Sequence, residues 1–288
     1  MKPGLHGVWS STNTLSRDDL ARLAQAVERL GYDVFWYPES TAYESLSLAG
    51  FMLGRTERLA LGSGIANIYA RDANTAMAGH NTLNALYGDR FILGLGVSHV
   101  PLVEGVRGHV YGPPVTAMLG YLQRMMSAKV DVAAPARNIV LAALGPKMLA
   151  LARDMVQGAL PYCVTPEHTA QASAILGPDR WLCVEQKICF TSDAAVARGV
   201  AAGNLKRYLA MTNYRNNWLR LGFTEAELSG SGSERFLDAM VLWGTETQIR
   251  DRLDAHRKAG ATHVCIQPLD PGGGAMADMR ALEAFAPR

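Results

Sequence analysis

The sequence predicts an α/β protein of the (β/α)₈ class, a TIM barrel, that forms a single domain over residues 1–288. Two observations lead to this prediction: eight short apolar runs recur along the chain, and a helical stretch follows each run. The length also suits one such barrel, for which about 250 residues is typical. The runs are residues 4–9, 34–37, 59–62, 91–95, 139–144, 159–163, 181–190 and 263–268.

The first strand–helix–strand unit shows the alternation clearly. Ser16 is followed three residues later by Asp19, which is the spacing of a helix-initiating capping box. Apolar residues then repeat at helical spacing up to Gly31, which can end the helix. The next run, 34–37, is apolar throughout, as expected of a strand that is packed on its inner side and covered by helices outside.

Later units use the same devices. We expect a helix over about residues 75–86, between the third and fourth runs. Pro146 and Pro166 follow the fifth and sixth runs, where the first position of a helix tolerates proline. The last long helix is predicted to begin at Thr245, with Gln248 completing a second capping box.

The spacing changes after the seventh run, where far more residues than one helix needs precede the eighth. We interpret residues 191–244 as a helical insertion that covers the barrel mouth as a lid. Helices are expected over about 193–211 and 213–221, and the Gly/Ser loop at 229–233 is expected to be its mobile point. The alternative is a surface excursion with no role at the mouth.

Composition excludes several classes of protein. With 49% hydrophobic residues the chain can form a large core, and its net charge of +2 gives no basic patch for nucleic acid. No apolar run could span a membrane and no signal peptide precedes the first strand, so the cytoplasm is expected. The four cysteines form no CxxC pair and are expected to be buried thiols. They are Cys163, Cys183, Cys189 and Cys265.

Barrel enzymes place their active sites at the carboxyl ends of the strands, so residues just after each run are the candidates. Glu39 follows the second run and could hydrogen-bond a cofactor ring or transfer a proton; it could equally be a structural carboxylate that binds a loop amide. After the fourth run, Gly94-x-Gly96 is not a dinucleotide fingerprint, because His99 occupies the third glycine position. Ser98 and His99 would instead project into the mouth.

Three further patterns bear on chemistry. Glu185 and Lys187 lie on the same face of the seventh strand. They could form an inward-pointing ion pair. Alternatively, Lys187 could form a Schiff base with the substrate of a barrel lyase. Residues 145–148 join a strand to a helix, where free amides and the helix dipole suit phosphate. The seven histidines show no metal-binding spacing, so no metal site is expected.

Together these positions resemble the bacterial luciferase-like family of flavin- and deazaflavin-dependent oxidoreductases, in the branch assigned to coenzyme F-420 (F420), an 8-hydroxy-5-deazaflavin. The resemblance extends over nearly the whole chain. Its most specific segments are residues 35–39, 61–71, 90–99 and 142–147.

The resemblance implies a tricyclic ring in the barrel mouth. The bulge after the third strand, Gly64, Ile65, Ala66 and Asn67, would support one ring face, often through a non-proline cis bond, here Gly64–Ile65. It further implies that Glu39 is the acid near the reactive ring and that Ser98 and His99 contact the cofactor. Leu144, Gly145, Pro146, Lys147 and Met148 would bind its phosphate.

One departure affects the expected chemistry. Many members of the family carry a histidine directly after the acid of the second strand, and this chain has Ser40 there. Glu39, His99 or Tyr162 would then take over its acid–base role. An aromatic, apolar substrate site is expected from Trp9, Tyr43, Tyr69, Tyr162 and Trp218, although each could be core.

The leading hypothesis is therefore an oxidoreductase that transfers a hydride between F420 and a small organic substrate. The first alternative is an FMN-dependent two-component monooxygenase fed by a flavin reductase; a deazaflavin reductase is the corresponding partner for F420. An alternative of another class is a flavin-binding protein without turnover. The resemblance also implies a homodimer through the helices that contain residues 45–53 and Met77 and Leu83.

Overall fold

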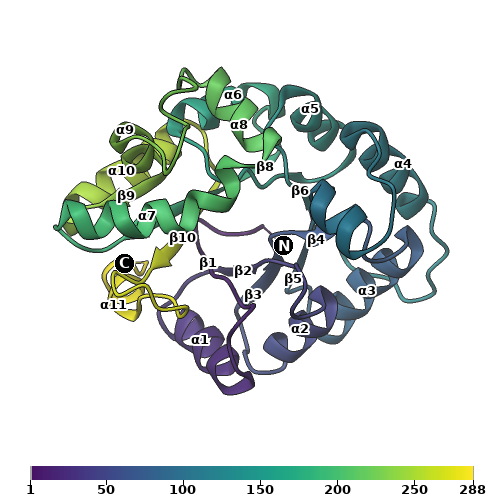
Figure 1. Ribbon diagram of the computed structural model, residues 1–288. Coiled ribbons are helices and arrows are strands. Elements are labelled where there is room, and N and C mark those ends of the chain that lie inside the picture. Colours follow the sequence, from purple (N-terminus) through teal and green to yellow (C-terminus); the bar gives the residue numbers. More distant parts are fainter. Residues whose placement is uncertain (1, 288) are drawn as a thin grey trace.

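Eight parallel strands form a closed ring in the computed structural model, which describes residues 2–287 (Figure 1). They are β1 (His6–Trp9), β2 (Val34–Tyr37), β3 (Ala60–Ser63), β5 (Phe91–Gly96), β6 (Ile139–Leu141), β7 (Gly158–Ala159), β8 (Trp181–Cys189) and β10 (His263–Leu269). Each pairs with its neighbour in this order, and β10 closes the ring by pairing with both β8 and β1. The predicted TIM barrel is confirmed.

Helices surround the ring, and α11 lies with the C-terminus beside α1 (Figure 1). They are α1 (Arg17–Arg29), α2 (Ser45–Leu53), α3 (Ala73–Leu86), α4 (Pro114–Met126), α5 (Pro146–Met155), α6 (Pro166–Leu176), α7 (Ala194–Leu209), α8 (Thr212–Arg220), α9 (Glu234–Met240), α10 (Glu246–Lys258) and α11 (Met279–Ala284), with a π-helical segment at Pro101–Val106. Both predicted capping boxes, at Ser16 and Thr245, are confirmed by reciprocal hydrogen bonds.

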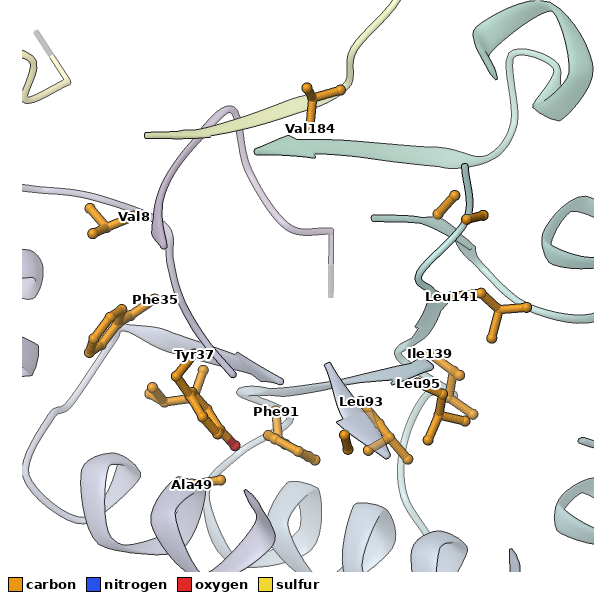
Figure 2. Packing of buried hydrophobic residues seen from close by; sticks show 14 of the residues in the cluster. Val8, Phe35, Tyr37, Ala49, Phe91, Leu93, Leu95, Ile139, Leu141 and Val184 are labelled. Atoms are coloured by element: carbon orange, nitrogen blue, oxygen red, sulfur yellow. The ribbon is translucent and has the colours of Figure 1, made fainter. Parts of the chain in front are cut away.

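Successive residues of a strand point into two different apolar layers, one outside the ring of strands and one inside it. Figure 2 shows Phe35, Phe91 and Leu93 pointing from the strands toward the surrounding helices. Their sequence neighbours Trp36 and Ile92 belong to a second cluster that fills the barrel. This two-sided burial explains why the strand sequences are continuously apolar.

Two predicted strands end several residues before their apolar runs do. The run 139–144 is a strand only to Leu141, and the run 159–163 is a strand only at Ala159, where β7 ends. Pro161 explains the second case, because proline has no N–H to donate to the ladder. A short strand, β4 (Ala66–Asn67), pairs with β5 and has no apolar run of its own.

The segment 191–244 forms the helices α7, α8 and α9, and it also contains a short strand, β9 (Val241–Trp243), that the sequence did not indicate. β9 lies parallel to the end of β8, with Val241 opposite Lys187. The Gly/Ser loop is held by a hydrogen bond from Gly232 N to Ser229 O and by the Ser233 cap of α9. Its mobility stays a prediction.

All four cysteines are free and buried, as expected. Within residues 2–287 no helix has both the length and the apolar character that a membrane span requires. The same residues contain no group of three His, Cys, Asp or Glu side chains arranged to hold a metal ion.

Candidate functional site

The bulge between β3 and β4 lies at the carboxyl end of the barrel. Its Gly64–Ile65 peptide bond is cis, as the resemblance implied. The indole Nε1 of Trp9, at the end of β1, donates to the carbonyl oxygen of Gly64 at 3.1 Å. Gly96 leaves room for the bulge, because a Cβ there would overlap the Ile65 side chain. The bulge is therefore held by a hydrogen bond from β1 and packs closely against β5.

Glu39 lies against this bulge, but its carboxylate is already occupied. Oε2 accepts the amide of Asn67 at 2.7 Å, and Oε1 accepts the amide of Ser45 at 3.1 Å and pairs with the Arg71 guanidinium. The Glu39 side chain is only 2% exposed. This geometry favours the structural alternative for Glu39 over the catalytic one. Arg71, which also pairs with Glu44, was not singled out from the sequence because its partner is distant along the chain.

Ser98 and His99 follow β5, and Tyr111 donates a hydrogen bond to the Ser98 carbonyl oxygen at 3.2 Å. The imidazole of His99 is half-buried and its centroid lies 5.9 Å from that of Tyr214 on α8. Burial and the charge of Arg207 lower the pKa of His99 below 6.5. His99 is therefore a neutral imidazole near pH 7, able to accept a proton.

An aromatic cluster joins His99 to the bulge. The Tyr162 ring lies 5.2 Å from Trp9, 5.5 Å from Tyr208 and 6.3 Å from Tyr214. The Tyr162 hydroxyl donates to Gln267 Oε1 at 2.9 Å and accepts from Tyr208 at 3.2 Å. Burial raises the pKa of Tyr162 and Tyr208, so both remain neutral phenols. The sequence indicated Trp9 and Tyr162 but not the tyrosines of α7 and α8.

Lys187 and Glu185 form the predicted inward ion pair. The Lys187 Nζ lies 3.0 Å from Glu185 Oε1 and 3.1 Å from Cys163 Sγ, and both charged side chains are fully buried. Although burial opposes it, the neighbouring Cys163 and Glu185 raise the pKa of Lys187. A protonated lysine does not form a Schiff base, so this geometry disfavours the lyase reading.

The other three predicted substrate contacts lie apart from this cluster or beneath it. Tyr43 donates to Leu15 O at 2.8 Å, and Tyr69 stacks on Tyr111 at 6.0 Å. Trp218 is fully buried and donates to Cys163 O at 3.0 Å. The expectation that Trp218 lines the mouth is wrong, because it forms the core that attaches α8 to the barrel.

The amino end of α5 has the form expected of an anion site. Gly145 is its N-cap and no side chain caps it. Arg220, from the end of α8, brings its guanidinium to 3.9 Å from the position of a Cβ on Gly145. Arg220 donates to Asn217 Oδ1 at 3.1 Å, while the buried Asn217 Nδ2 has no hydrogen-bond partner. Sequence reasoning missed Arg220, which reads as an ordinary surface residue of a helix.

One detail of that prediction is wrong. The Met148 amide is not free, because it donates to Gly145 O at 3.1 Å. The predicted positions Leu144, Pro146 and Lys147 do lie at the turn, and Lys147 is exposed. His168 supports the turn by bonding Leu144 O at 2.8 Å, and its Nδ1 is buried without a partner.

Two adjoining hollows open on the β1, β10 and α7 side of the mouth. We call the first the β1–α7 hollow; it has a volume of about 660 Å³. Its lining includes Trp9, Ser11, Asn204, Lys206, Arg207 and Gln267. The second, about 620 Å³, shares Ser11, Asn204 and Gln267 and extends over the loop at 270–277.

The barrel, the bulge and the aromatic mouth define a protein of the class that binds a planar cofactor at the strand ends. The model of the luciferase-like monooxygenase family matches residues 2–263, and the chain belongs to this family. The luciferase-like assignment made from the sequence is thereby confirmed.

Curated relatives are similar over most of their length. A Mycobacterium tuberculosis protein, whose name assigns it provisionally to the coenzyme F420-dependent oxidoreductases, is 24% identical and covers 92% of this chain and 94% of its own. The 5,10-methylenetetrahydromethanopterin reductase of Methanolobus tindarius is 27% identical, covering 88% and 91%.

Solved structures share the fold at low identity. An F420-dependent secondary alcohol dehydrogenase, in complex with an F420–acetone adduct, has a TM-score of 0.80 at 12% identity and covers 99% of this chain and 98% of its own. The oxygenating constituent of a Pseudomonas putida 3,6-diketocamphane monooxygenase, in complex with FMN, has a TM-score of 0.71 at 12% identity, covering 98% and 97%. At these identities the likeness concerns the fold.

Proposed function

We propose that this protein is an oxidoreductase that binds F420 at the barrel mouth and transfers a hydride to or from a small organic substrate. The observation that carries the proposal is the uncapped amino end of α5 with Arg220 and the unpartnered Asn217 amide beside it. Such an arrangement suits a phosphate. The name of the first curated relative supports a deazaflavin cofactor, and the name of the second supports a reductase. Neither name refers to a reaction with oxygen.

The chain's own residues have distinct tasks in this proposal. Gly64 and Ile65 support one face of the ring, with Trp9 holding the bulge in place. Gly145 and Lys147 bind phosphate together with Arg220, and the aromatic cluster excludes water. The bound deazaflavin supplies a two-electron carrier that transfers hydride.

His99 is proposed to move the accompanying proton. It is the mouth histidine whose lowered pKa keeps it neutral, and a ring nitrogen can accept or return a proton in step with the substrate. Glu39 is proposed to position Asn67 and Arg71 instead, since all its contacts are internal.

The second candidate is an FMN-dependent two-component monooxygenase with a partner reductase, favoured by the FMN-bound structure that shares the fold. A flavin-binding protein without turnover is the third, because Ser40 replaces the family's histidine. Either would use the same phosphate turn.

Fluorescence titration of the purified protein with F420 and with FMN, side by side, tests the proposal. We expect tighter binding of F420, and oxidation of reduced F420 when a substrate is present. Tighter binding of FMN, with oxygen uptake on addition of a reductase, would establish the monooxygenase. Binding of either cofactor without turnover over a broad substrate panel would favour the third candidate.

A further inference from the structure

Two positive charges reach the mouth without an acidic partner. Lys206 and Arg207 both line the β1–α7 hollow, and no Asp or Glu side chain belongs to that lining within residues 2–287. The adjoining hollow contains Asp270, whose carboxylate is already bound by the amides of Gly272 and Gly274. The hollow is therefore electropositive.

Arg207 is held in place by an aromatic ring. Its guanidinium stacks 4.6 Å from the centroid of Tyr208 and also donates to the Tyr208 hydroxyl. Burial opposes its charge, and the main interactions that raise its pKa come from the tyrosines Tyr208, Tyr162 and Tyr214. Neutral phenols do not balance a cation, so Arg207 is fixed in position while its charge stays available.

A third residue of the hollow also lacks a partner. The Oδ1 atom of Asn204, one turn before Arg207 on α7, is buried and makes no hydrogen bond. A buried polar atom without a partner costs free energy unless a ligand or water meets it. The hollow thus offers both a charge and a polar contact to a bound molecule.

The hollow adjoins the bulge and differs from the α5 end of the mouth. Trp9 lines it, and the same indole donates to Gly64 O. The α5 end has its own arginine, Arg220, whose nearest neighbours are Gly145 and Asn217. The insertion thus brings one arginine to the phosphate turn and another to the side where a substrate would lie.

We infer that the substrate is a small organic anion, whose carboxylate or phosphate binds Arg207 with Lys206 beside it. A guanidinium binds either oxyanion with two parallel hydrogen bonds. This inference rests on the proposed function, since it names the substrate class of the same site. It does not require that the ring be F420 rather than FMN.

Calorimetric titration of the cofactor-free protein tests it with two matched pairs of probes: hexanoate against hexanamide, and glycerol 3-phosphate against glycerol. At least one anion should bind about tenfold or more tightly than its neutral analogue, the value expected of a charged hydrogen bond. The pair that shows the preference identifies the oxyanion. Equal binding within both pairs would overturn the inference.

Variants test which side chain supplies the positive charge that binds the anion. Arg207→Gln should abolish the preference and Lys206→Gln should reduce it. Arg22→Gln, at a side chain 70% exposed on α1, is the matched control and should retain it. If Arg207→Gln does not fold, Arg207→Lys should retain a weakened preference. A preference that survives in folded Arg207→Gln would overturn the assignment.

Measurements of cofactor affinity distinguish a substrate-binding site from a site that binds the anionic tail of a deazaflavin. Arg207→Gln should leave F420 affinity within about threefold of wild type, a change too small for a lost charged contact. Weaker binding of F420 but not of a dephosphorylated, tail-free analogue would assign Arg207 to the cofactor and overturn the inference. If the wild type binds anions but neither F420 nor FMN, the proposed function fails while the anion site remains.

Discussion

At the residue scale, the titratable groups of the mouth fall into two sets: those whose hydrogen bonds and ion pairs are complete within the protein, and those whose interactions are incomplete. Glu39 and Lys187 are buried in complete sets of internal contacts, and each therefore holds structure. Arg207 lines the β1–α7 hollow and His99 is only half-buried, and neither has a carboxylate among the main groups that shift its pKa. Chemistry is expected from the groups whose interactions are incomplete.

Replacing Glu39 by Gln should destabilise the fold. The change leaves Arg71 without its buried partner, and an amide nitrogen would face a backbone N–H of Asn67 or Ser45. Breaking a buried pair costs about 3–5 kcal/mol. Urea denaturation measures the loss, and Glu44→Gln, at a half-exposed partner of Arg71, should cost only about 1 kcal/mol. An unchanged unfolding free energy combined with a large fall in turnover would return Glu39 to a catalytic role.

Replacing Arg207 by Gln should raise the pKa of His99. The positive charge of Arg207 disfavours the imidazolium, and the variant removes that charge while burial remains. Titration of the His99 ring protons by NMR measures the shift. Lys129→Gln, a control outside the site, should leave the His99 titration unchanged. A His99 pKa that stays constant in Arg207→Gln would mean that burial alone sets it.

At the element scale, α7 and α8 determine what the mouth can bind. α7 contributes Tyr208 and Arg207, while α8 contributes Tyr214 and Arg220. Trp218 attaches α8 to the barrel through the Cys163 carbonyl. These helices therefore contribute side chains to the proposed site, while the role of segment 191–244 as a lid stays a prediction.

Replacing Arg220 by Ala should weaken binding of F420 by about 1.5–3 kcal/mol, the scale of a hydrogen bond to a charged group. Lys147→Ala should cost only about 1 kcal/mol, since an exposed charge at a helix end contributes little. Fluorescence titration measures both. A dephosphorylated analogue should bind the two variants and the wild type equally. If Arg220→Ala weakens the analogue as much as F420, the residue shapes α8 rather than binding phosphate.

At the scale of the whole molecule, the barrel could be predicted because its strands are buried on both sides. Partners that are distant along the chain could not, since periodicity reports burial and not contact. Arg71 is 32 residues from Glu39, and Arg220 lies on a helix far in sequence from Gly145. The short strands β4 and β9 also escaped prediction, because two or three residues carry no readable alternation.

The homodimer remains a proposal, and we expect its interface to include the end of α3. Met52 and Leu83, expected to form it, are buried in their own barrel, whereas Leu86 at the end of α3 is 70% exposed. Light scattering at micromolar concentration should give twice the chain mass. Leu86→Asp should give the monomer mass with an unchanged circular dichroism spectrum. A monomer for the wild-type protein would reject the proposal.

Stability should fall on mild acidification because two histidines are buried in neutral form. Burial lowers the pKa of His256 and of His263 to about 4, from an ordinary 6.5. His256 lies between Thr169 and Gln186 at 2.8 and 2.9 Å, and His263 accepts the Trp36 indole at 3.0 Å. Protonating either ring in place would disrupt these contacts.

The direction of the effect follows from proton counting. Between about pH 6.5 and 4 the unfolded chain binds more protons at these two sites than the folded one, so stability rises with pH there. The contribution is complete above pH 6.5 and is lost as the pH falls toward 4, by about 3 kcal/mol for each histidine. Urea denaturation at pH 7, 6 and 5 should show the decline, and His256→Gln should make it less steep, leaving the part due to His263. His109→Gln, at an exposed histidine, should leave the profile unchanged. A flat profile in the wild type would mean that both rings take up protons without unfolding.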